Sequence, residues 1–168
     1  FSKNCKALEL LFFNDADDSE PTKVIRFDSN KNKTFYYWHV FVENVEPGQL
    51  YGYRVYGEYA PEKGYLFDGS KLLLDPYAKA IAIGKNYDRE KARQYGYENA
   101  AYAMKSVVID HDAYDWEGDQ PLQKPYSKSI IYELHVNGFT QNDNSGVSDR
   151  LRGTYLGLIE KIPYLQEL

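Results

Sequence analysis

The stretch that most restricts the fold of this chain lies near its end, at Ser129–Thr140 (SIIYELHVNGFT). Apolar side chains alternate with polar ones there and share one face: Ile130, Tyr132, Leu134 and Val136. Alternation with period two, ended by Gly138, predicts a β-strand. The other face carries Glu133 and His135, as expected for the inner face of a closed parallel barrel that lines a site. We therefore expect the first strand of a β/α barrel here.

The residues after this expected strand favour the same interpretation. A polar loop (141–152) leads into LGLIEKIPYLQEL, where apolar residues recur at roughly helical spacing: Leu156, Ile159, Ile162 and then Tyr164 or Leu165. Strand, loop and helix in this order form the first unit of a β/α protein. The chain starts without a methionine and stops within this expected helix, so we interpret it as a piece of a longer protein.

The earlier part of the chain predicts a different architecture, a β-sandwich. Thr34–Val45 is a long aromatic and β-branched segment, and Leu50–Gly57 is its expected hairpin partner after a Pro-Gly turn. Further strands are expected at Ala7–Phe13, Lys23–Asp28 and Lys105–Asp110. Short strands at even spacing favour a sandwich over βαβ units. An acidic, proline-containing linker follows at 111–124, so we expect two domains, 1–124 and 125–168.

Charge and composition exclude several classes of function. The net charge is −5 and the basic residues form no stripe, which argues against a nucleic-acid partner. No apolar run approaches the roughly 18 residues of a membrane span, and no signal peptide is visible, so no membrane partner is expected. The single Cys5 excludes an internal disulfide and fits a reducing compartment, which predicts a cytoplasmic protein.

Most residues that resemble site residues also have a structural explanation. The linker acids do not have the spacing of a calcium loop, and His39 has no partner spaced for a zinc site, so no metal or other cofactor is expected. Glu133 and His135 would be inward-facing and could simply bond to their neighbours. Aromatic side chains on the expected hairpin could stack on sugar rings or pack in the core: Tyr36, Trp38, Tyr51 and Tyr53.

Four blocks of the sequence resemble the N-terminal region of isoamylase-type and bacterial glycogen-debranching enzymes. They lie in order along almost the whole chain, at Tyr51–Ile81, Ser106–Asp119, Ile131–Thr140 and Arg152–Leu158. The GFT that ends the expected barrel strand and the RGTY block favour the isoamylase type over pullulanases and branching enzymes.

This resemblance implies an immunoglobulin-like β-sandwich of the family-48 carbohydrate-binding type, followed by the first strand and helix of a truncated family-13 (β/α)8 barrel. Such enzymes hydrolyse α-1,6 branch points of glycogen or amylopectin with retention, through an aspartate nucleophile and a glutamic acid. The family places both carboxylates on later barrel strands, so the resemblance assigns no catalytic residue to this chain and implies that the chain alone is inactive. The expected partner is an α-glucan: glycogen, amylopectin or maltooligosaccharides.

Trp38 and His135 are the candidate substrate-binding residues, and three roles stay open. The chain is part of a debranching hydrolase, a stand-alone glucan-binding module, or a scaffold that supports the barrel without binding sugar. A single barrel strand has two edges without partners, so self-association through residues 126–168 is also expected.

Overall fold

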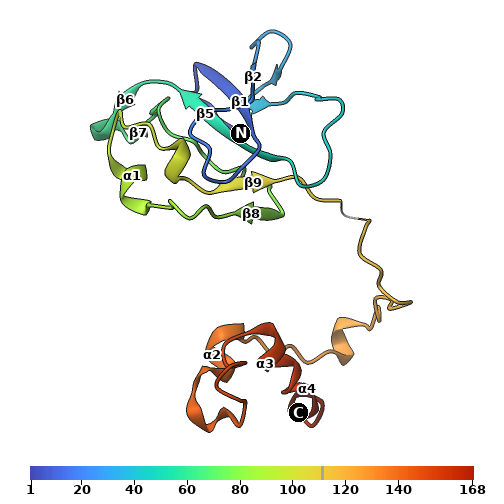
Figure 1. Cartoon of the computed structure of the whole chain (residues 1–168). Helices are drawn as coiled ribbons and strands as arrows, with labels where there is room; N and C mark the ends of the chain where they lie inside the picture. Colours follow the sequence, from blue (N-terminus) through green and yellow to red (C-terminus); the bar gives the residue numbers. More distant parts are fainter. Residues whose placement is uncertain (111) are drawn as a thin grey trace. The chain divides into compact units, whose positions relative to one another are not determined.

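The computed structural model describes residues 1–110 and 112–168, which form two units, Phe1–Asp115 and Trp116–Leu168 (Figure 1). The division between the units falls inside the segment that the sequence identifies as an acidic linker. Residues 112–125 contain no helix or strand, and His111, the first linker residue, lies outside the described residues. The first unit is built mainly of strands and the second of short helices.

The first unit is built on one antiparallel sheet with the strand order β2-β1-β5-β9-β8. Its two central strands pair along their whole length, from Ala7 opposite Tyr56 to Phe13 opposite Leu50. Two short hairpins, β3–β4 and β6–β7, lie outside this sheet. The strands of the main sheet are β1 (Ala7–Phe13), β2 (Lys23–Arg26), β5 (Leu50–Tyr56), β8 (Ala80–Ala82) and β9 (Lys105–Val107). The hairpin strands are β3 (Lys33–Thr34), β4 (Tyr37–Trp38), β6 (Tyr59–Ala60) and β7 (Tyr65–Leu66).

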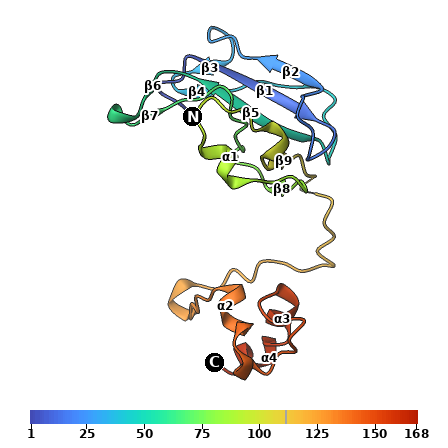
Figure 2. The same ribbon diagram turned by 60° about the vertical axis from the view of Figure 1, so that its left-hand side comes forward.

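Strand β1 is buried on both faces, which explains why its sequence is almost continuously apolar. Leu11 and Phe13 point to one face, where they pack with Leu72 and Ala100. Figure 2 shows α1 and the chain after it beside one face of β1 and β5. Leu10 and Phe12 on the opposite face are also buried, and they line a hollow with Val40, Val42 and Val45 of the loop that follows β4 (Tyr37–Trp38). This layered arrangement is consistent with a β-sandwich. Three short helices connect the strands: η1 (Pro61–Lys63), α1 (Arg89–Arg93) and η2 (Ala100–Tyr102).

A charged side chain completes this core. Lys105 on β9 is fully buried, and its Nζ lies 4.6 Å from the centre of the Phe13 ring. The ammonium donates hydrogen bonds to the carbonyl oxygens of Ala16 and Ala100, at 2.5 and 2.9 Å. Burial lowers the pKa of Lys105, and the nearby carboxylates of the acidic turn after β1 act in the opposite direction. The lysine therefore fixes that turn against the sheet through backbone hydrogen bonds.

The expected long strand at Thr34–Val45 is wrong, and so is its expected pairing with Leu50–Gly57. Only the two-residue strands β3 and β4 form there, around a turn in which Phe35 has a φ of 57°. The physical reason lies in β5, whose two edges are already occupied by β1 and β9. With no edge left to pair with, the rest of the segment crosses the sheet as a loop.

The second unit is a cluster of short helices: η3 (Tyr126–Lys128), α2 (Val136–Gln141), η4 (Asp143–Ser145), α3 (Tyr155–Ile159) and α4 (Ile162–Gln166). Its buried residues are few and small: Thr140, Val147 and Gly157. The single helix expected from LGLIEKIPYLQEL is divided into α3 and α4. Pro163 lies in the first turn of α4, where it needs no amide hydrogen, and it would break a helix that continued through from α3. No helix among residues 1–110 and 112–168 is long and apolar enough to cross a membrane.

The expected barrel strand at Ser129–Thr140 is also wrong for this chain. Residues 129–135 form no strand, and α2 begins at Val136. On the apolar face that was expected to be covered, Ile130 and Tyr132 are 91% and 54% exposed, while Leu134 and Val136 are half-buried. A strand needs a hydrogen-bonded neighbour, and none of the described strands pairs with this segment. The barrel architecture is therefore not formed by these residues alone.

Candidate functional site

A hollow of about 290 Å³ lies against the face of the sheet that carries Tyr53 and Val55. Trp38 of β4 and Phe27, which follows β2, line one side of it. The segment Leu73–Tyr77 lines another side. Strand β5 thus supplies the base, and two segments far from it in the sequence supply the walls.

Trp38 is half-buried in this hollow and is held by two neighbours. Its ring meets that of Phe27 edge to face, with 6.3 Å between ring centres. The Nζ of Lys33 lies 4.9 Å from the indole centre, within the range of a cation–π contact. The indole Nε1 is buried and has no hydrogen-bond partner among the described residues. A buried donor without an acceptor is unfavourable.

The polar side of the hollow is organised by Asp75. Its carboxylate accepts hydrogen bonds from the Tyr51 hydroxyl, at 2.9 Å, and from the backbone N–H of Tyr77, at 2.8 Å. Its own N–H donates to the Ser106 hydroxyl on β9. Burial, followed by the charge of Asp75, raises the pKa of Tyr53 to about 12. Tyr53 is therefore a neutral phenol at physiological pH and can both donate and accept a hydrogen bond.

The structure places the expected aromatic side chains at different points of the first unit. Trp38 and Tyr53 line the same hollow. Tyr51 lies on the same sheet face and bonds to Asp75. Tyr36 is exposed and touches Phe1. His39, which belongs to the segment expected as a long strand, is exposed, and its Nε2 is 3.0 Å from the Thr34 hydroxyl.

His135, the second candidate, lies in the other unit. Its Nδ1 accepts a hydrogen bond of 3.0 Å from the N–H of Gly138 and so caps the start of α2. Glu133 is exposed beside it. The two candidates Trp38 and His135 therefore belong to separate units, and the role of His135 in a site stays a prediction.

Several residues of the hollow were not predicted. Phe27 and the segment Leu73–Tyr77 have no local sequence pattern that marks them as site residues. The hydrogen bond that joins Tyr51 to Asp75 spans 24 positions of the sequence. Among residues 1–110 and 112–168, no group of three or more His, Cys, Asp or Glu side chains is placed to hold a metal ion.

Comparison with known proteins gives one family match. Residues 1–78 match the model of carbohydrate-binding module 48, the isoamylase N-terminal domain.

Curated relatives match along most of the chain. Isoamylase 1 of Arabidopsis thaliana is 36% identical over 161 residues, which cover 95% of this chain and 20% of the relative. Isoamylase 3 of Oryza sativa is 40% identical over 158 residues, or 90% of this chain and 19% of the relative. The glycogen debranching enzyme of Yersinia enterocolitica is 36% identical over 173 residues, or 100% of this chain and 25% of the relative. The chain thus spans a quarter or less of these proteins.

Among solved structures, the product complex of the glycogen-degrading pneumococcal virulence factor SpuA has a similar fold. The TM-score is 0.61 at 18% sequence identity, over 99% of this chain and 16% of that one. The likeness supports the fold. The sequence matches show that residues 1–78 are similar to carbohydrate-binding module 48, the isoamylase N-terminal domain, and that the homologues of the chain are isoamylases and glycogen debranching enzymes.

Proposed function

We propose that the first unit binds α-glucan through the hollow around Trp38, as part of a longer enzyme that hydrolyses α-1,6 branch points. The observation that carries this proposal is the position of Trp38. It lies within the part of the chain that matches a carbohydrate-binding module, on the wall of a hollow, with a buried Nε1 donor that has no partner among the described residues.

The chemistry of the hollow fits a neutral sugar. Indole and phenol rings offer flat apolar surface to the C–H face of a pyranose, while a few polar groups fix its orientation. Trp38 and Phe27 supply the apolar surface, and Tyr53 and Asp75 supply hydrogen-bonding groups. Asp75 already accepts two hydrogen bonds, so its oxygens are oriented before any sugar arrives.

Tryptophan fluorescence tests this proposal, because the chain has two tryptophans, Trp38 and Trp116. Maltoheptaose or β-cyclodextrin is titrated to millimolar concentration into the unmodified chain and two variants. Trp116→Phe leaves Trp38 as the only reporter, and we expect its signal to change on binding. For Trp38→Ala, amide shifts should show at least tenfold weaker binding, the equivalent of about 1.4 kcal/mol.

Two outcomes would contradict the proposal. If sugar-dependent amide shifts survive Trp38→Ala unchanged, Trp38 is not the centre of the site. If the unmodified chain shows no change at millimolar sugar, the unit is a scaffold and not a glucan-binding module.

We also propose that the chain functions within two domains, an immunoglobulin-like sandwich at 1–124 and the start of a barrel at 125–168. In the longer protein, residues 129–136 would gain strand neighbours and His135 would face the barrel interior. Support comes from the length of the relatives and from the exposed Ile130 and Ile131. Amide exchange in a chain extended through the barrel tests this: residues 130–136 should become strongly protected, and unchanged fast exchange would contradict the proposal.

Two further expectations belong to this proposal. The chain alone should release no reducing sugar from glycogen, because the carboxylates of the family lie on later barrel strands. Release that survives repurification would contradict this. A cytoplasmic location, based on the single cysteine, is tested by fractionating cells that express the whole protein.

A further inference from the structure

A second aromatic surface lies outside the hollow around Trp38. Tyr59 of β6 and Tyr95, which follows α1, bring their ring centres to 3.8 Å with 32° between the ring planes. The rings are 36 positions apart in the sequence, yet they form the closest aromatic pair described in this chain. Their side chains are 43% and 59% exposed, so much of this apolar surface faces solvent.

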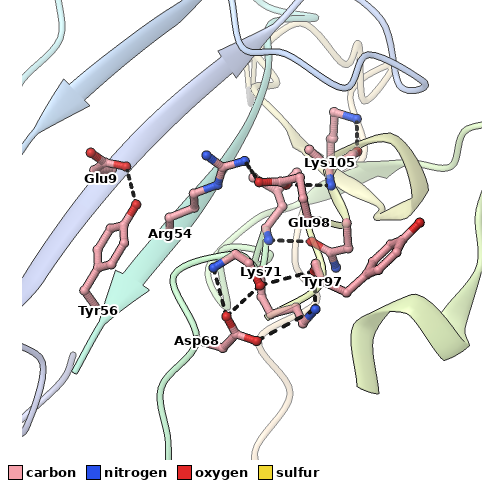
Figure 3. Close-up of polar contacts among 12 residues, drawn as sticks. Glu9, Arg54, Tyr56, Asp68, Lys71, Tyr97, Glu98 and Lys105 are labelled. Atoms are coloured by element: carbon pink, nitrogen blue, oxygen red, sulfur yellow. Dashed lines mark hydrogen bonds and ion pairs between the residues drawn. The ribbon is translucent and has the colours of Figure 1, made fainter. Parts of the chain in front are cut away.

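The pair borders a small hollow of about 220 Å³ with a polar base. Asp68 and Lys71 form this base, with Lys71 Nζ 3.8 Å from Asp68 Oδ2 and with side chains only 11% and 9% exposed. Figure 3 shows Lys71 between Asp68 and the carbonyl of Tyr97, to which its ammonium donates. Asp68 accepts a hydrogen bond of 2.8 Å from the N–H of Gly96. The base of the hollow is therefore held rigidly by buried contacts.

The charges around this hollow balance one another. Lys71 is paired with Asp68, and Arg93, at the rim, is 3.2 Å from Glu90. The hollow therefore combines apolar rings and hydrogen-bonding groups with little net charge. That combination suits a neutral polyhydroxylated ligand better than a phosphate or an acidic peptide, which would need unpaired cations.

A third hollow, of about 510 Å³, lies between the hollow beside Tyr59 and Tyr95, called the tyrosine hollow, and the hollow around Trp38. It shares Leu66, Asp68 and Lys71 with the tyrosine hollow. It shares Val55 and Leu73 with the hollow around Trp38. Neighbouring hollows therefore share lining side chains. The three hollows adjoin one another along the first unit, in the order tyrosine hollow, third hollow and hollow around Trp38.

We infer that the Tyr59–Tyr95 pair is a second stacking surface for sugar, and that one linear α-1,4-glucan chain extends from Trp38 to this pair. The identity of the ligand rests on the proposed function, while the second surface rests on the geometry of the three adjoining hollows. The consequence is a preference for chain length. A short oligosaccharide occupies the Trp38 end alone, and a longer one also contacts the tyrosines.

Calorimetric titration with maltotriose, maltopentaose and maltoheptaose tests the inference on the whole chain. We expect affinity to rise about tenfold from the shortest to the longest sugar, which corresponds to one good aromatic contact of about 1.4 kcal/mol. The double variant Tyr59→Ala/Tyr95→Ala should lose this rise and keep the affinity for maltotriose. Tyr59→Phe/Tyr95→Phe keeps the rings and should retain the rise. Tyr87→Ala, which removes an exposed tyrosine of the same unit outside the three hollows, is the matched control.

The outcomes separate this inference from the proposal on which it rests. If maltotriose binds and the rise with length survives the double alanine variant, the second surface is wrong and the Trp38 site stands. If affinity does not depend on length in the unmodified chain, the inference is likewise overturned. If no sugar binds the unmodified chain, both fail. Retained binding of maltotriose in the double variant shows that the protein is folded.

Discussion

At the scale of single residues, Tyr53 links the candidate site to the stability of the sheet. It lies at the centre of β5 and lines the hollow around Trp38. Burial and the charge of Asp75 both favour its neutral form, so its pKa rises to about 12 from the usual tyrosine value of about 10. An ionisable group on a central strand makes folding depend on pH in a defined window.

The sign of this dependence follows from the direction of the shift. The folded protein holds the Tyr53 proton more tightly than the unfolded chain, so the contribution to stability is complete below pH 10 and is lost as pH rises towards 12. By pH 11 the loss amounts to about 1.4 kcal/mol. The Tyr53→Phe variant has no phenol to ionise at this position. Between pH 9 and pH 11 its free energy of unfolding should therefore fall by about 1.4 kcal/mol less than that of the unmodified protein.

Urea unfolding at the two pH values measures this difference. Tyr126→Phe removes a phenol from an 89% exposed position and serves as the control, which should behave as the unmodified protein does. Equal losses in the unmodified chain and in Tyr53→Phe would show that Tyr53 is not responsible.

At the scale of elements, the second unit depends on the close approach of α3 to the loop before it. Gly157 is buried in α3, and a Cβ at this position would lie 2.2 Å from the carbonyl oxygen of Leu151. That oxygen belongs to the backbone and cannot move aside as a flexible side chain can. Gly138 in α2 differs, because the nearest atom to a Cβ there is His135 Nδ1 at 3.5 Å, an ordinary contact.

These two glycines form a matched pair for a test of helix packing. Gly157→Ala should destabilise the second unit by about 1–3 kcal/mol, because the added methyl group forces the helix away from the loop. Gly138→Ala should be neutral or stabilise α2 by up to about 1 kcal/mol, since alanine favours the helix.

Amide exchange of residues 136–166 reports on this unit alone, which matters because the two units need not unfold together. We expect faster exchange in Gly157→Ala and equal or slower exchange in Gly138→Ala. The same response in both variants would rule out the close approach of α3 as the cause.

At the scale of the whole molecule, the two units differ in how well their apolar side chains are covered. The first unit has a core around Leu11 and Phe13. In the second unit the buried residues are small, and large apolar side chains remain on its surface: Ile130, Ile131, Tyr155, Leu156 and Ile159. Contiguous exposed apolar surface favours association.

We therefore expect the chain to self-associate through residues 126–168 as its concentration rises. The double variant Ile130→Lys/Ile131→Lys removes two of the most exposed apolar side chains from a segment without regular structure, and it should shift light scattering towards the monomer. Gln120→Lys/Gln123→Lys adds the same charge without removing apolar surface and should associate as before. A monomeric unmodified chain at high concentration would contradict this expectation.

The sequence predicts the strands of the main sheet that have strong local patterns. The segment Ala7–Phe13 is a strand over the expected residues, and Leu50–Gly57 and Lys105–Asp110 contain β5 and β9. Val40, Val42 and Val45 all line a hollow against the sheet, although the segment forms no strand there. Alternation and residue type are local properties, so they can be inferred without knowing the partner.

Strand pairing and the site are different, because both depend on residues far apart in the chain. The alternation of Ile130–Val136 predicts a strand as the apolar run of β1 does, yet of these two segments only β1 has a neighbour on each side. A strand without neighbours leaves its backbone groups unpaired. Trp38 could be chosen as a candidate by its type, but its hollow exists because Phe27, Tyr53 and Asp75 meet there. Residue types and local periodicity were thus available from the sequence. The partners of β5, the walls around Trp38 and the stacking of Tyr59 on Tyr95 were decided by long-range packing, which no local pattern encodes.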